Sequence, residues 1–221
     1  MEKPSLETTY TDRTVALIRG IVSACPLIGG IISEAVTYFI PNQKLDRITE
    51  WLRILDANLS SVAGDIDRVK DRLRDEKGLD LFEESVDQAA RALSDMRRKH
   101  LANMLTRSLT QEELKHAESK KLLNILRELT DEELIMLVYY SEYSERSELG
   151  FSGSFNMIRQ YPEILSPPLL TKGSVQEERD KAALQESYRN TLIRFGLLYK
   201  EDNFFYLTGF GHLLLHYILD R

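Results

Sequence analysis

The chain has 221 residues, with 29 lysine and arginine residues against 35 aspartate and glutamate residues, a formal net charge of −6. Its hydrophobic fraction of 43% is enough for a packed core, and a single cysteine excludes an intramolecular disulfide framework or a multi-cysteine zinc site. Because the net charge is negative, the chain as a whole has no general electrostatic attraction to nucleic acid. By segment, most of the acidity lies in residues 130–174.

The most apolar stretch, 15–40, is interrupted by Arg19, Pro26 and Glu34. A helix that spans a bilayer needs about 20 nearly uncharged residues, so we expect two short helices that break at Pro26. This hairpin is either buried under longer helices or released toward a membrane or a partner protein. The candidate contact residues are the large aliphatic side chains Leu17, Ile18, Ile21, Leu27, Ile28 and Ile31.

The first dozen residues are polar and acidic, which is not the pattern of a secretory signal. Cys25 lies inside an apolar run and is typical of a buried thiol in a reducing compartment. We therefore expect a cytoplasmic protein, with a peripheral membrane location as the alternative.

Apolar residues then alternate at spacings of three and four, which predicts a long heptad helix over 42–76. Gly64 weakens its middle, and Lys77–Gly78 is interpreted as its end. A second stripe predicts another helix of roughly 30 residues, so that the two form a long antiparallel hairpin. The stripes serve bundle packing or self-association. They comprise Leu45, Ile48, Leu52, Leu55, Leu59, Val62, Ile66, Val69 and Leu73, then Phe82, Val86, Ala89, Leu93 and Met96.

Two Thr-x-x-Glu sequences, Thr110 with Glu113 and Thr130 with Glu133, predict capping boxes at two helix starts. Between them lies a zone, 97–121, in which basic residues outnumber acidic ones. Its densest basic run, RRKH at 97–100, is interpreted as a solvated helix face. The zone as a whole is a candidate contact for an acidic partner or a membrane surface. Its candidate residues are Arg97, Arg98, Lys99, Lys120 and Lys121.

The C-terminal part predicts a helix at 131–144, loops with one short helix near 154–161, and a helix from about 175 to 195. Two short strands around a polar turn and a final helix capped by Thr208 follow. The letters FGLL at 195–198 and YLTGFG at 206–211 give this order a resemblance to the winged-helix family. We therefore expect a mainly α protein, a long helical hairpin or bundle over 1–129 followed by a small winged-helix-like α+β domain over 130–221.

Winged helices bind DNA or proteins, and the charges disfavour DNA here. The helix at 175–195 has a net charge of zero, and Glu201–Asp202 would bring negative charge toward phosphates. The candidate contacts of this unit are Arg189, Asn190, Arg194 and Lys200.

No motif for catalysis, nucleotide binding or metal binding is evident, and we expect no cofactor and no enzymatic activity. His212 and His216 stand four apart on one helix, but no third ligand lies near except Asp220, so they are interpreted as surface histidines.

The run RRKHLANMLTRSL at 97–109, followed by ESKKLLNILRELTDEELIML at 118–137, resembles the layout of bacterial abortive-infection alpha proteins. That resemblance implies an anti-phage or growth-arrest role. The sequence therefore favours a non-enzymatic bacterial interaction protein that acts through protein or membrane contacts or self-association. The alternative is a winged-helix DNA-binding transcriptional regulator.

Overall fold

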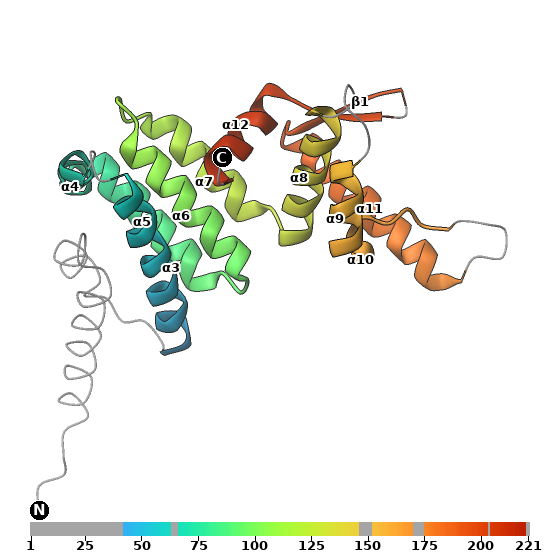
Figure 1. The fold of residues 1–221 in the computed structure, drawn as a ribbon, viewed down its shortest axis with the longest axis horizontal. Helices are drawn as coiled ribbons and strands as arrows, with labels where there is room; N and C mark the ends of the chain where they lie inside the picture. The colour runs from blue at the N-terminus through green and yellow to red at the C-terminus, as the bar shows by residue number, and fades with distance from the viewer. Residues whose placement is uncertain (1–41, 63–65, 146–151, 170–174, 203, 220–221) are drawn as a thin grey trace, which may run out of the picture. The chain divides into compact units, whose positions relative to one another are not determined.

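The computed structural model describes residues 42–62, 66–145, 152–169, 175–202 and 204–219 (Figure 1). The expected apolar hairpin at 15–40, with its six candidate residues, lies outside the described residues. Within them, no helix combines the length and apolar character needed to cross a bilayer.

The fold is mainly helical, with one small antiparallel sheet, and the chain divides into two compact units. The first holds the described residues up to Leu123 together with 217–219, and the second holds residues 124–216. In chain order the elements are α3 (Asn42–Ser61), α4 (Ile66–Arg74), α5 (Glu76–Arg91), α6 (Asp95–Thr110), α7 (His116–Glu128), α8 (Asp131–Glu145), α9 (Ser152–Gln160), α10 (Pro162–Leu165), α11 (Gln176–Arg194), β1 (Leu198–Glu201), β2 (Phe204–Leu207) and α12 (Gly209–Ile218).

The core of the first unit is a bundle in which α6 contacts α3, α4 and α5. Ten of the 16 residues of α6 are buried, so this helix is enclosed by its neighbours. Trp51 of α3 is fully buried with its ring 5.8 Å from that of Phe82 in α5. Most of the predicted heptad stripe faces this core: six of its members are at most 3% exposed, and Val62 is half-buried. The six are Ile48, Leu52, Leu55, Leu59, Val69 and Leu73.

The two long helices expected from the stripes are each divided into two shorter helices. The helix predicted over 42–76 consists of α3 and α4, with Gly64 between them. The second predicted helix divides between α5 and α6, because Ala92 is extended and the Ser94 side chain accepts a hydrogen bond from the Arg97 N–H to start α6. Leu93, a member of the predicted stripe, is consequently 79% exposed.

Gly78 is not the helix end that its sequence context predicts. It lies in the first turn of α5, whose N-cap Asp75 accepts a hydrogen bond from the backbone N–H of Lys77. Gly78 is buried and its Cα faces the backbone of Arg72 in α4. The glycine therefore permits close contact of two helices rather than ending one.

Two arginines of α4 hold the C-terminal end of α6. Arg72 donates through Nη1 to the Leu109 carbonyl at 2.6 Å and through Nη2 to the Glu112 carbonyl at 3.0 Å. Arg68 donates to the Thr110 carbonyl at 3.0 Å. Cations satisfy the free carbonyls and the dipole at a helix C-terminus, so α6 ends here.

Only one of the two predicted capping boxes forms. Thr130 and Glu133 exchange the expected bonds, with Thr130 N to Glu133 Oε2 at 2.8 Å and Glu133 N to Thr130 Oγ1 at 3.2 Å. The prediction at Thr110 is wrong, because this residue is the last of α6 and its hydroxyl donates to the Thr106 carbonyl.

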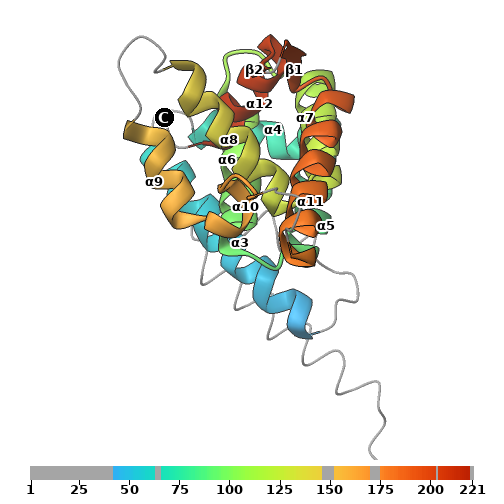
Figure 2. The ribbon, with the colours of Figure 1, turned by 90° about the vertical axis from the view of Figure 1, so that its right-hand side faces the viewer.

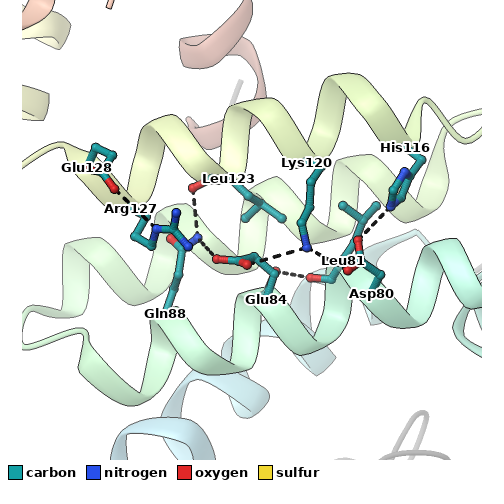
Figure 3. A network of polar contacts seen from close by, with 10 residues as sticks. Asp80, Leu81, Glu84, Gln88, His116, Lys120, Leu123, Arg127 and Glu128 are labelled. Carbon is teal, nitrogen blue, oxygen red and sulfur yellow. Dashed lines mark hydrogen bonds and ion pairs between the residues drawn. The ribbon is translucent and has the colours of Figure 1, made fainter.

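A polar network joins α5 to α7 (Figure 3). Lys120 Nζ lies 2.8 Å from Asp80 Oδ1 and 3.6 Å from Glu84 Oε2, and His116 Nε2 lies 2.8 Å from Asp80 Oδ2. Gln88 completes the row by donating to the Leu123 carbonyl at 2.9 Å. The network aligns the polar edge of α7 along α5.

Asp80 is expected to make the stability of this unit depend on pH. Its hydrogen bonds with Lys120 and then His116 lower the pKa of Asp80 below 3.8. A lowered folded pKa adds stability that is present above the unfolded value and lost as the pH falls through the folded value. Because Asp80 is 43% exposed, solvent screening limits this contribution to about 1 kcal/mol or less.

The free energies of unfolding of wild type and Asp80→Asn, measured in urea, should therefore differ at about pH 6, and the difference should be smaller at about pH 3. A difference that is equally large at both values would show that the carboxylate charge is not its cause.

In the second unit, α8 packs against α9, α10, α11 and β2 (Figure 2). Gly196, with φ of +70°, ends α11, and the hairpin pairs Leu198 with Leu207 through Glu201 with Phe204. The Thr208 hydroxyl accepts a hydrogen bond from Gly211 N at 2.9 Å and caps α12. The helix, two-strand and helix order predicted from about 175 onward is confirmed.

Candidate interaction groove

Most of the candidate residues of the predicted basic zone at 97–121 make contacts within the first unit. Arg98 is buried, donates to the Ala92 carbonyl at 2.9 Å and pairs with Asp95, so it links the end of α5 to the start of α6. Arg97 and Lys120 are half-buried, and Lys120 belongs to the α5–α7 network. Only Lys99 and Lys121 of the five are exposed.

The expectation that the run at 97–100 forms a solvated face is therefore wrong. Arg98 and His100 are both under 10% exposed, because α6 is enclosed by three other helices. The central position of α6 could not be predicted from its sequence, because its buried side includes polar residues: an arginine, a histidine and an asparagine.

The four predicted winged-helix contacts separate into two groups. Arg189 and Lys200 lie 5.3 Å and 5.7 Å from the centre of the Phe205 ring, as expected of cation–π contacts. Asn190 and Arg194 are exposed on α11, where they line a shallow hollow together with Glu186.

A larger groove of about 660 Å³ lies within the second unit, between the start of α8, α10 and the first half of α11. Its apolar lining comes from Ile164, Leu184 and the ring of Tyr188. Five carboxylates line it against one lysine, which gives the lining a net charge of −4. These charged residues are Glu132, Glu163, Glu177, Glu178, Asp180 and Lys181.

Hydrogen bonds fix the walls of the groove to one another. Gln185 of α11 is buried and donates to the carbonyls of Ile164 and Ser166, both at 2.8 Å. Lys181 Nζ donates to the Pro162 carbonyl at 2.9 Å. These three contacts attach α10 to α11, so the groove is formed before any partner arrives.

The electrostatic environment of the groove is negative. Burial raises the pKa of Tyr188, and the charges of Glu132 and Glu133 raise it further. Leu184 is 53% exposed at the groove, so its apolar surface is open to a partner. The geometry therefore suits a ligand that is both apolar and positively charged.

Sequence reasoning missed this groove. Its acidic residues come from three helices that are distant in the chain, and in sequence Glu177 and Glu178 are typical of the first turn of any helix. The concentration of acidic residues in 130–174 was the available signal, but only the fold brings Glu132 and Glu163 to α11.

Within the described residues, no three histidine, cysteine, aspartate or glutamate side chains are grouped to hold a metal ion. His212 and His216 are both exposed on α12. Comparison of the chain with protein families, curated proteins and solved structures finds no match.

Proposed function

We propose that this chain is an interaction protein whose C-terminal unit docks a partner protein in the groove between α8, α10 and α11. The observation that carries the proposal is an exposed apolar side chain, Leu184, at a groove whose walls are already fixed by Gln185 and Lys181. A preformed groove loses little conformational entropy on binding.

The order of elements supports a winged-helix-like module in this role. Helix α11, the hairpin of β1 and β2, and helix α12 follow the succession on which the resemblance rests. Winged helices serve as protein-binding modules as well as DNA readers, so the surface decides between the two uses.

The surface favours a protein partner over DNA. Arg189 and Lys200 are held at Phe205, and Glu186 lies beside Asn190 and Arg194 on the outward face of α11. A DNA reader needs a basic surround for phosphate contacts. The DNA-binding regulator is therefore the second candidate, supported by the exposure of Asn190 and Arg194.

The biological setting that we propose is bacterial abortive infection, on the resemblance of residues 97–137. In that setting the protein responds to infection through protein contacts, with a membrane surface as the alternative target. The N-terminal segment 15–40 is the proposed membrane or partner contact.

The test is phage plating and growth of a bacterial host that expresses the chain. We expect wild type to reduce plaque number or growth, Leu184→Glu to abolish this effect, and Leu93→Glu to retain it. Leu93 is the matched control because it is an exposed leucine of the first unit that does not line the groove.

Equal activity of Leu184→Glu and wild type would contradict docking in the groove, and an inactive wild type would contradict the anti-phage setting. Fluorescence anisotropy with labelled duplex DNA tests the second candidate function, the DNA-binding regulator. Saturable binding that weakens steeply with salt and is lost in Arg194→Glu would favour the DNA regulator.

A further inference from the structure

We infer that the groove recognises a basic amphipathic helix of the partner protein, with lysine or arginine residues beside a leucine-type face. This inference rests on the proposed function, because it names the chemistry of the segment that docks between α8, α10 and α11. The groove has a volume of about 660 Å³ and is lined by both apolar side chains and carboxylates.

The apolar floor of the groove indicates that the partner helix has an apolar face. Ile164 is 7% exposed and forms the base, while Leu184 and Tyr188 of α11 stand one turn apart along one wall. An apolar stripe on a partner helix would cover Leu184 and remove its apolar surface from water.

The acidic residues around the groove, its rim, indicate that the partner helix is positively charged. Glu163 on α10 and Glu177 on α11 are exposed on two different walls, and Glu132 on α8 supplies a third. Glu178 already accepts a hydrogen bond from Leu169 N, and Asp180 accepts one from Gln176. The groove thus presents negative charge on three sides of an apolar floor, which repels anionic ligands such as phosphates and attracts cations.

The test measures binding of fluorescein-labelled helical peptides of about 18 residues. One peptide carries lysine residues along both sides of a leucine face, a second replaces the lysines by serine, and a third replaces them by glutamate. We expect saturable binding of the lysine–leucine peptide, weaker binding of the serine–leucine peptide, and none of the glutamate–leucine peptide.

The charge variant is the double substitution Glu163→Gln and Glu177→Gln, for which we expect about two- to tenfold weaker binding at low salt. The difference should shrink as salt screens the rim charges. The matched control is Glu186→Gln, an exposed carboxylate on the other face of α11, which should bind like wild type. Circular dichroism melts verify that all variants fold.

Equal affinities of wild type and the double variant for the lysine–leucine peptide would overturn the inference. Preference for the serine–leucine peptide, lost in Leu184→Glu, would also overturn it, while leaving groove docking intact. Absence of saturable binding to any peptide overturns both. Sedimentation of the protein alone identifies a second copy as the occupant, and a dimer lost in Leu184→Glu would likewise overturn the inference.

Discussion

Tyr217→Ala is expected to destabilise the first unit by about 3–5 kcal/mol, the usual cost of removing a large buried aromatic side chain. Tyr217 lies in the last turn of α12 and is 1% exposed. Its hydroxyl donates to Glu118 Oε1 at 2.7 Å and accepts a hydrogen bond from Gln111. The substitution therefore removes a ring from the core and leaves two polar partners unpaired.

The neighbouring contacts explain why the last turn of α12 is part of the core. Asn103 of α6 donates to the Ile218 carbonyl at 2.9 Å, and Arg107 donates to the Leu219 carbonyl at 2.8 Å. Asn103 also accepts a hydrogen bond from Asn58 of α3. These hydrogen bonds tie α3, α6 and the end of α12 together. The amide of Asn103 is buried, and a buried polar group is costly when its partner is lost.

Urea unfolding of wild type and Tyr217→Ala measures the loss. Tyr217→Phe is the matched control, because it keeps the ring and removes only the hydroxyl, for an expected cost of about 1–2 kcal/mol. An unchanged midpoint for Tyr217→Ala would show that the C-terminal residues are dispensable to the bundle. Equal losses in both variants would assign the whole effect to the hydrogen bonds.

Hydrophobic periodicity predicted which residues enter the core but not where the helices break. Leu52, Leu55 and Leu59 are buried as the heptad pattern predicts. The break before α6 depends on the Ser94 side chain and an extended Ala92, and the same apolar pattern runs through it to the exposed Leu93. The local N-cap at Ser94 therefore breaks the helix although the apolar stripe continues through this position.

Local backbone signals predicted the second unit well, because they act within a few residues. Gly196 ends α11, Asp202 adopts positive φ in the hairpin turn, and Thr208 caps α12. The groove has no such local signal. Glu132 and Glu177 are 45 residues apart in the sequence, and their common environment depends on how α11 packs against α8 and α10.

Gly78→Ala is expected to destabilise the protein by about 1–3 kcal/mol, which is typical of overpacking. In an isolated helix the same change would add about 1 kcal/mol of stability, so the sign tests the packing. A Cβ at Gly78 would lie 2.0 Å from the Arg72 carbonyl oxygen and 2.7 Å from its carbonyl carbon. Both are backbone atoms, so α4 and α5 must separate to admit the methyl group.

The matched control is Gly209→Ala at the start of α12, where an added Cβ meets no atom within 4 Å. Urea unfolding should show Gly209→Ala near wild type and Gly78→Ala less stable. Equal stabilities would mean that α4 and α5 can separate freely at this point.

We expect the two helices to resist separation, because the guanidinium of Arg72 also binds the carbonyls of Leu109 and Glu112. Moving its backbone away from Gly78 strains those bonds, so one methyl group in α5 disturbs the end of α6 as well.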